Sequence, residues 1–283
     1  MQENIDDNSD VSVLLITLNN EQDLHRVLSS IKLSNPGQII VSDGGSNDQS
    51  VSIAKEYTSD VYVGPRGRAR QMNYGLEMVN RKYLLLIEGD HEYPEGFITD
   101  LKDEFCALKY FGLQATLVCK FERNFWERGI SCFYSIHQRR KGIKPMIGGP
   151  SIFLADEYKS TLNHIDVQGF GIDTTIGQYL ENKGLSVGLG KTIAFQYQEL
   201  DINKFLRKYF NYGRGDYEFY LRHKKEWKIP RKIKSITHIM NRYIIAYPII
   251  SLKASNPIIA IPYLWLAGIV RYSGWIYEIF RRK

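Results

Sequence analysis

The sequence predicts an α/β fold in which helices flank a largely parallel sheet. Over residues 11–87, short apolar runs rich in β-branched residues alternate with segments of helical spacing. This alternation is typical of parallel strands joined by right-handed crossovers. Small and acidic residues directly follow two of the apolar runs, at 43–48 and 88–90. Ligands bind at the carboxyl ends of strands in open α/β sheets, so we expect the functional site there.

Periodicity and turn residues assign the elements in chain order. Residues 11–18 are apolar and β-branched, which predicts a buried strand, and Leu24, Val27, Leu28 and Ile31 then recur at helical spacing. By the same reasoning we expect strands at 11–18, 38–42, 61–63, 83–87 and 113–121, and helices at 21–32, 46–57, 68–79, 96–108 and 171–182. The strand at 113–121 departs from the simple alternation, and residues 146–154 are glycine-rich and then apolar.

Charge divides the chain into two parts. Lys204–Lys283 holds 17 Lys and Arg against four Asp and Glu, a net charge of +13, whereas the remainder holds 20 against 27, a net charge of −7. An acidic body with a basic tail suggests a polyanionic partner, either nucleic acid or an anionic membrane surface.

The tail favours the membrane surface over nucleic acid. Residues 256–270 are almost wholly apolar, but Pro257 and Pro262 interrupt them, and a spanning helix needs roughly 20 uninterrupted apolar residues. Broken apolar helices flanked by basic and aromatic residues are typical of elements that lie in the membrane interface. The alternative is a pair of helices that closes the protein's own core.

Cysteines and the N-terminus indicate the compartment. Cys106, Cys119 and Cys132 are odd in number and lack the close pairing of a zinc site. Reduced thiols of this kind favour the cytoplasm. Residues 1–10 are acidic and polar, so they form neither a signal peptide nor a transit peptide, and we expect them to be disordered.

Two acidic clusters and one basic segment predict a nucleotide site. Asp43-Gly44-Gly45-Ser46 and Glu88-Gly89-Asp90 would each be unremarkable turns alone, but both follow buried strands, and Thr17 and Asn19 end the first strand. The carboxylates suit a divalent metal that holds a diphosphate, and the small residues allow a ligand to approach the backbone. Arg68 opens a helix, where its guanidinium and free backbone N–H groups suit phosphate.

In combination these motifs resemble family 2 of the inverting GT-A glycosyltransferases. The resemblance covers roughly residues 11–215. It rests on Thr17-x-Asn19, Asp43-Gly44-Gly45-Ser46-x-Asp48, Gly67-Arg68 to Asn73, and Glu88-Gly89-Asp90 with Pro94. It implies a GT-A fold, that is, a Rossmann-like mixed sheet flanked by helices. Residues 216–283 would then form a basic and apolar helical extension at the membrane interface.

The resemblance also implies roles for the residues near the strand ends. Asp43 would recognise the nucleotide base, in a pocket lined by Thr17 and Asn19 and approached closely at Gly44. Asp90 would bind Mn²⁺ or Mg²⁺. Glu88 stands where the family has Asp; with its extra methylene it would reach the ribose or a metal-bound water, beside Gly89.

Further along the chain, the resemblance implies a general base. Asp173 matches the second member of the family's acidic pair, although Ile172 stands where Glu is usual. The alternative is that Asp173 is an N-cap before Thr174, with Asp166 as the reserve base. Gly148-Gly149-Pro150-Ser151 resembles the family's loop beneath the acceptor. The segment 205–215 resembles one that covers the diphosphate, so Arg214 is expected to contact it.

The function expected from these residues is inverting transfer of one sugar from a nucleotide-diphosphate donor to a hydroxyl acceptor. A UDP-sugar is favoured and a GDP-sugar is possible, and the acceptor would be a lipid-linked or envelope glycan at the cytoplasmic face of the cell membrane. The Gln-x-x-Arg-Trp motif of processive enzymes is absent, which argues against a polymerising synthase. Three alternatives stand beside this: a sugar-nucleotide-binding subunit without activity, a sugar-phosphate nucleotidyltransferase, and a nucleic-acid-binding protein.

Overall fold

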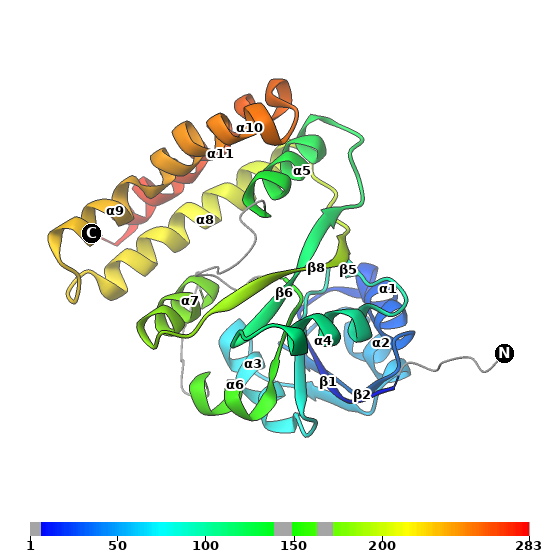
Figure 1. Cartoon of the computed structure of the whole chain (residues 1–283). Coiled ribbons are helices and arrows are strands. Elements are labelled where there is room, and N and C mark those ends of the chain that lie inside the picture. The colour runs from blue at the N-terminus through cyan, green and yellow to red at the C-terminus, as the bar shows by residue number, and fades with distance from the viewer. Residues whose placement is uncertain (1–6, 139–148, 163–171, 283) are drawn as a thin grey trace. The chain divides into compact units, whose positions relative to one another are not determined.

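The computed structural model describes residues 7–138, 149–162 and 172–282 (Figure 1). The chain divides into two compact units. The first unit comprises Met1–Leu117, Lys141–Gln168 and Ile176–Tyr197, and the second comprises Val118–Arg140, Gly169–Thr175 and Gln198–Lys283. The expected boundary after residue 215 falls inside a helix, Ile202–His223, which belongs wholly to the second unit.

A mixed sheet forms the core of the first unit. Its strands are β1 (Asn8–Thr17), β2 (Pro36–Asp43), β3 (Asp60–Val63), β4 (Tyr83–Ile87), β5 (His91–Glu92), β6 (Gly112–Cys119), β7 (Ser151–Leu154) and β8 (Val187–Gln196). They lie in the order β3-β2-β1-β4-β7-β6-β8-β5. The pairs β1–β2, β1–β4 and β2–β3 are parallel, whereas β4–β7, β6–β7 and β5–β8 are antiparallel. The predicted α/β class with a mixed sheet is therefore confirmed.

Amphipathic helices pack against this sheet. They are α1 (Glu21–Lys32), α2 (Ser50–Tyr57), α3 (Arg68–Met78), α4 (Phe97–Ala107) and α6 (Ala155–Leu162). A further helix, α7 (Ile172–Asn182), extends over both units. On α1 the predicted apolar positions Leu24, Val27, Leu28 and Ile31 are all fully buried. Their spacing places them on one face of the helix, so the sequence pattern alone determined how α1 packs.

Strand β1 begins at Asn8, earlier than the sequence indicates. The Asn8 side chain is buried, and its Nδ2 donates to the Ser34 carbonyl at 2.8 Å and to Thr99 Oγ1 at 3.0 Å. These bonds satisfy a polar side chain that would otherwise be costly to bury. The expectation of disorder is therefore wrong for residues 8–10, while residues 1–6 lie outside the described part of the chain.

The second unit is helical and has an aromatic core. Its further helices are α5 (Phe125–Gln138), α8 (Ile202–His223), α9 (Ile229–Ile239), the π-helical segment η1 (Met240–Ala246), α10 (Tyr247–Ala254) and α11 (Pro257–Arg281). Phe205, Tyr209, Tyr243 and Tyr263 are among its buried residues, and the hydroxyls of Tyr209 and Tyr263 lie 3.1 Å apart. Each large ring thus contributes buried area, and the hydroxyls of the tyrosines find partners, Tyr243 accepting from Arg271 Nη1 at 2.9 Å.

The pair α8 and α11 is held by close backbone approach and by charge (Figure 1). A Cβ at Gly213 of α8 would lie 1.8 Å from the Arg271 carbonyl oxygen, and one at Gly274 of α11 would lie 2.0 Å from the Phe210 carbonyl oxygen. Arg271 Nη2 donates to Asp216 Oδ1 at 2.7 Å. Both glycines are therefore required by packing.

Residues 257–281 of the apolar tail form one continuous helix, α11, where an interruption at Pro262 was expected. Pro257 occupies the first turn of α11, where it has no hydrogen bond to lose, and the Asn256 side chain accepts from the Ile258 N–H at 3.1 Å. Pro262 lies inside the helix, near its start. The expectation that Pro262 breaks the segment is therefore wrong. Within the described ranges, no helix is both long and apolar enough to cross a bilayer.

Candidate functional site

The ends of four strands bring most of the predicted site residues of the first unit together. Thr17 at the end of β1 pairs in register with Asp43 at the end of β2, and Leu15 pairs with Ile87 at the end of β4. Leu86 pairs with Ser151, where the antiparallel β7 begins. The segments 17–20, 43–48, 88–90 and 149–151 therefore share one edge of the sheet, as parallel topology requires.

The Asp43 carboxylate organises its own loop. Its Oδ1 accepts from the N–H groups of Gly45 and Ser46 at 2.8 and 2.7 Å, and its Oδ2 accepts from the Ser46 hydroxyl. Gly45 has φ +82°, which suits glycine in this turn. Asp43 has no exposed surface. The predicted turn after Asp43 is therefore present, whereas the role of Asp43 in recognising a base stays a prediction.

Hydrogen bonds join the loop after β1 to the loop after β2. Asn19, at φ +50°, donates its N–H to Ser46 Oγ at 2.8 Å and accepts from the Asn47 N–H through Oδ1 at 2.9 Å. Asp48 Oδ2 accepts from the Glu21 N–H at 3.1 Å. Hydrogen bonding from Ser50 lowers the pKa of Asp48 below its usual value. These bonds hold Asn19 in place at this edge of the sheet.

Gln71 of α3 is a site residue that the sequence reasoning missed. It is buried, and its Nε2 donates to the carbonyls of Thr17 at 2.7 Å and Ser42 at 3.1 Å. The Gln71 carbonyl in turn accepts from Ser42 Oγ at 2.7 Å. A Cβ at Gly44 would lie 3.0 Å from the Gln71 side chain. Gly44 thus leaves room for Gln71, which fixes the ends of β1 and β2.

The predicted phosphate-binding residue Arg68 lies beside Glu88. Arg68 Nη2 is 2.5 Å from Glu88 Oε1, and the two side chains are 44% and 29% exposed. Gly67, with φ +146°, is the N-cap residue directly before α3, which begins at Arg68. An exposed guanidinium at a helix N-terminus favours anionic ligands. The structure therefore brings Arg68 and Glu88 together at the edge of the sheet where β4 ends.

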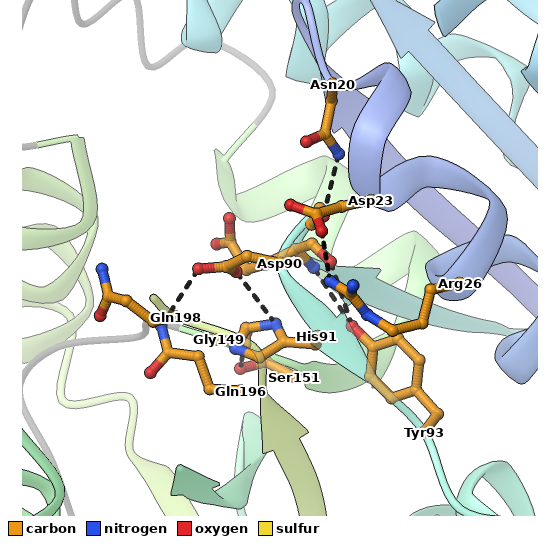
Figure 2. Close-up of polar contacts among 12 residues, drawn as sticks. Asn20, Asp23, Arg26, Asp90, His91, Tyr93, Gly149, Ser151, Gln196 and Gln198 are labelled. Carbon is orange, nitrogen blue, oxygen red and sulfur yellow. Dashed lines mark hydrogen bonds and ion pairs between the residues drawn. The ribbon is translucent and has the colours of Figure 1, made fainter. Parts of the chain in front are cut away.

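Three residues hold the segment 88–90, and Figure 2 shows two of them, Asn20 and Tyr93, around Asp90. Asn20 Nδ2 donates to the Gly89 carbonyl at 2.9 Å, and the Tyr197 N–H donates to the Asp90 carbonyl at 2.7 Å. The buried Tyr93 hydroxyl lies 3.3 Å from the Glu88 amide nitrogen. Burial raises the pKa of Tyr93 well above its usual range, so this hydroxyl stays protonated as a fixed polar contact.

The Asp90 carboxylate remains open to a ligand. It is 39% exposed; its Oδ2 accepts from Gln196 Nε2 at 3.2 Å, and its Oδ1 lies 3.7 Å from Nδ1 of the buried His91. An ionised carboxylate has about four lone-pair sites, so these contacts leave capacity for a cation. Figure 2 shows the carboxylate between Gln196 and His91.

The donor set around Asp90 fits a Mg²⁺ or Mn²⁺ ion that shares its coordination with substrate. In the described part of the chain no three His, Cys, Asp or Glu residues gather as a ready-made metal cage. Mg²⁺ in nucleotide enzymes is held by one or two carboxylates plus substrate phosphates, and the Asp90 carboxylate meets that requirement. The Glu88 carboxylate is engaged by Arg68.

Two further predicted residues, Asp173 and Arg214, lie in the second unit. Asp173 is in the first turn of α7, and Thr175 two residues later accepts from Arg222 Nη1 of α8 at 3.1 Å. Arg214 of α8 donates through Nε to Oε2 of the fully buried Glu278 at 2.9 Å. That contact gives Arg214 a structural role that the sequence did not predict. Asp166, Gly148 and residues 169–171 lie outside the described residues.

Comparison with known proteins agrees with this fold. The protein family described as "Glycosyl transferase family 2" matches residues 12–159. None of the curated proteins matches the chain.

Solved structures show the same fold at low sequence identity. A mannosyltransferase from Pyrobaculum calidifontis, solved with GDP-Man and Mn²⁺, is 12% identical over 97% of this chain and 88% of its own, with a TM-score of 0.63. Glucosyl-3-phosphoglycerate synthase from Mycobacterium tuberculosis, solved with Mn²⁺, UDP-Glc and phosphoglyceric acid, is 15% identical over 69% and 73%, with a TM-score of 0.51. TarS from S. aureus is 14% identical over 83% and 43%, with a TM-score of 0.53.

Proposed function

The chain belongs to glycosyl transferase family 2, and on that premise we propose that it is a metal-dependent inverting glycosyltransferase. It would move one sugar from a nucleotide-diphosphate donor to a hydroxyl acceptor. The observation that carries this proposal is the meeting of the open Asp90 carboxylate with Arg68 and Glu88 at one sheet edge. A cation site and a guanidinium on the same edge are what a diphosphate leaving group requires.

The donor is proposed to be a nucleoside-diphosphate sugar, with UDP favoured over GDP. Mn²⁺ with GDP-Man and Mn²⁺ with UDP-Glc occur in two solved structures of the same fold. Both donors share the diphosphate, and the preference for UDP comes from the resemblance of the sequence motifs. Asp43, Thr17 and Asn19 would line the pocket for the base, as the resemblance implies.

The chemistry follows from where charge develops. As the bond between the sugar and the diphosphate breaks, negative charge builds on the leaving oxygen. Mg²⁺ or Mn²⁺ bound by Asp90 would supply electrostatic stabilisation of that charge. Arg68 would contribute through charge-assisted hydrogen bonds. Asp173 would accept the proton of the attacking hydroxyl, a function worth on the order of 10²–10⁴-fold in rate. Attack from the face opposite the leaving group inverts the anomeric carbon.

The acceptor is proposed to be a lipid-linked or envelope glycan met at the cytoplasmic face of the membrane. Support comes from the composition of the second unit, where basic residues alternate with long apolar runs. Such interleaving suits a lipid surface better than the phosphodiester backbone of a nucleic acid.

The test is the thermal stability of the purified protein with UDP, GDP and other nucleotides, in Mn²⁺, Mg²⁺ or EDTA. A ligand at a hundredfold excess over Kd stabilises the fold by about 2.7 kcal/mol. We expect a shift with one diphosphate that is lost in EDTA and in Asp90→Asn. The exposed Asp103 of α4 provides the matched control Asp103→Asn, which should retain the shift.

Two results would contradict the proposal. The absence of a thermal shift with any nucleotide would contradict the donor site. A wild-type thermal shift in Asp90→Asn would contradict the assignment of Asp90 as the metal ligand. If binding is normal but no acceptor is glycosylated, the chain is a sugar-nucleotide-binding subunit, which is the second candidate. The replacement of the family's Glu by Ile172 beside Asp173 is the observation that favours it.

A further inference from the structure

Helix α9 carries its apolar stripe on the exposed side. The stripe consists of Ile229, Ile233, Ile236 and Met240, which are 72%, 55%, 43% and 45% exposed. Spacings of four, three and four residues place them on one line along the helix. The buried positions of α9 are Ser235 and Ile239. A helix that packs only on its own protein turns its apolar stripe inward, so α9 has an outward-facing apolar surface to cover.

Helix α11 has a second exposed stripe. It consists of Ile258, Trp265, Ile269, Ile276 and Phe280, which are 82%, 48%, 62%, 50% and 67% exposed. Their spacings of four and seven residues again define one face. Gly274, about half a turn away from Ile276 at 3.6 residues per turn, packs against Phe210 of α8. The stripe therefore points away from α8.

The π segment η1 keeps the first stripe continuous. A regular α-helix would carry the line from Met240 towards residues 243 and 247, but Tyr243 and Tyr247 are buried. A π-helix has more residues per turn, so the next exposed position of the stripe comes later in the sequence. The stripe continues at Ile245, Ile249 and Leu252, which are 47%, 62% and 63% exposed. The α9–η1–α10 segment thus presents one apolar line along its whole length.

The two stripes lie on the same side of the helices. Tyr272 of α11 donates its hydroxyl to the Ile236 carbonyl at 3.0 Å and accepts from the Met240 N–H at 3.2 Å, so α9 and α11 are neighbours. They run antiparallel (Figure 1). Buried Ile239 directly precedes stripe residue Met240, and buried Gly268, which faces Tyr243, directly precedes stripe residue Ile269.

Each helix thus turns a buried residue towards the shared aromatic core at about 100° from its stripe, in the same rotational sense. Two antiparallel helices whose stripes are offset by the same angle, in the same sense, from the side on which they pack are related by a two-fold axis. Both stripes therefore lie on the same side of the pair.

The charge of these helices complements an anionic surface. Residues 228–283 contain ten Lys and Arg but a single acidic residue, Glu278. The Glu278 side chain has no exposed surface and bonds to Arg214, Arg281 and Arg282. Lys234 and Lys253 are exposed beside the stripe on α9 and α10. Each such cation near an anionic leaflet contributes about 1 kcal/mol of attraction.

We propose that this face, defined by the two stripes of α9–η1–α10 and α11, is a docking surface for an anionic lipid bilayer. The helices lie in the plane of the interface, with the stripes at the boundary between headgroups and acyl chains. Tryptophan side chains such as Trp265 are enriched at this boundary. This deepens the proposed function, on which it rests only in that the bilayer would be where a lipid-linked acceptor is met.

The test is flotation of the full chain with vesicles of phosphatidylcholine and phosphatidylglycerol in equal parts, and with phosphatidylcholine alone. The variant Ile233→Ser/Trp265→Ser/Ile269→Ser should lose roughly a hundredfold in affinity for both vesicles. Lys234→Gln/Lys253→Gln should lose affinity only for the anionic vesicles. Leu33→Ser, which removes a 70% exposed apolar side chain from the first unit, is the matched control and should bind normally.

Undiminished flotation of the triple variant would overturn the proposal. So would a wild-type protein that ignores vesicles but sediments as a dimer that the triple variant dissociates, because a second copy would then cover the face. The nucleotide-induced thermal shift is measured on every variant in parallel. If the stripe controls flotation while no nucleotide shifts the wild type, docking stands and the proposed transfer reaction fails.

Discussion

The Arg68 guanidinium and the Glu88 carboxylate form an ion pair at the sheet edge, with Nη2 and Oε1 2.5 Å apart. Arg68 comes from the start of α3 and Glu88 from the end of β4. A half-exposed pair contributes at most about 1 kcal/mol to stability. The pair therefore holds the Arg68 guanidinium at the sheet edge, where an incoming diphosphate could replace the Glu88 carboxylate as its partner.

Arg68→Ala separates ligand binding from stability. We expect the Kd for the donor diphosphate, measured by calorimetry, to rise roughly tenfold to a hundredfold, since a charge-assisted hydrogen bond is lost. The free energy of unfolding should change by less than about 1 kcal/mol. Arg70→Ala, which removes an exposed arginine from the same helix, should leave the Kd unchanged. Equal effects of the two variants would refute the assignment.

Gln71→Met tests a residue that would never touch the ligand. The substitution keeps the length of the side chain but leaves the carbonyls of Thr17 and Ser42 without their buried donor. The Thr17 carbonyl keeps the Gly44 N–H as a donor at 3.0 Å, so we expect a cost of about 0.5–1.5 kcal/mol for each lost hydrogen bond. We expect a lower denaturant midpoint together with weaker nucleotide binding, because Thr17 lies at the site. A variant as stable as the wild type would show that Gln71 does not hold the strand ends.

Gly213→Ala should disrupt the pair of helices α8 and α11. The new Cβ would lie 1.8 Å from the Arg271 carbonyl oxygen, a backbone atom that cannot rotate away. Overpacking of this kind costs about 1–3 kcal/mol or more, and differential scanning calorimetry would register it as a lower Tm. Ser273→Ala on the exposed side of α11 provides the comparison and should be close to neutral. A wild-type Tm in Gly213→Ala would mean that the helices do not meet there.

The buried carboxylates of the second unit predict sensitivity to acid. Burial alone would raise the pKa of Asp216, but the charge and hydrogen bonds of Arg271 outweigh it and hold the pKa at about 2, against an ordinary 3.8. Hydrogen bonds from Arg281 oppose burial and, with those from Arg282 and Arg214, hold the pKa of Glu278 at about 2, against 4.5.

Because both pKa values are lower in the folded state, their stabilisation is complete above about pH 4.5 and is lost as the pH falls towards 2. Chemical unfolding between pH 6 and 2, a range set by these shifts, should show that decline. In Asp216→Asn the decline should be shallower and the stability near neutral pH lower. Glu226→Gln, at a 78% exposed side chain, should behave as the wild type. A pH-independent wild type would rule out the ion pairs.

The sequence determined the first half of the fold because its signals there are local. The spacing on α1 and the β-branched runs of β1, β2 and β4 each depend on nearest neighbours along the chain, and the acidic loops follow directly from the strand ends. Strand β8 and helix α5 escaped prediction. Gly188 and Gly190 lie within β8, while α5 contains Gly129, where a Cβ would clash with the Tyr263 ring. Only tertiary contacts explain such glycines.

The position of the candidate site residues at one edge of the sheet was predictable from the sequence, but their hydrogen-bond partners were not. The strand-end motif placed Asp43, Glu88 and Asp90 correctly at one edge. It could not reveal that Asp43 bonds to its own loop, nor that Gln71 is buried, since a glutamine in a polar helix usually faces water. Arg214 was expected at a diphosphate and bonds to Glu278, which lies 64 residues further along the chain. Partners so distant in sequence leave no local signature.

Because of the π segment, the number of residues between α9 and α10, and not only their identity, determines which apolar side chains of α10 continue the exposed stripe of α9. Met240–Ala246 accommodates extra chain without a loop. Deleting any one of these seven residues would rotate everything that follows by about a quarter turn relative to α9. Ile249 and Leu252 would then leave the line of Ile233, even though every remaining side chain is unchanged. A gain or loss of one codon here would thus act on this surface as strongly as several substitutions together.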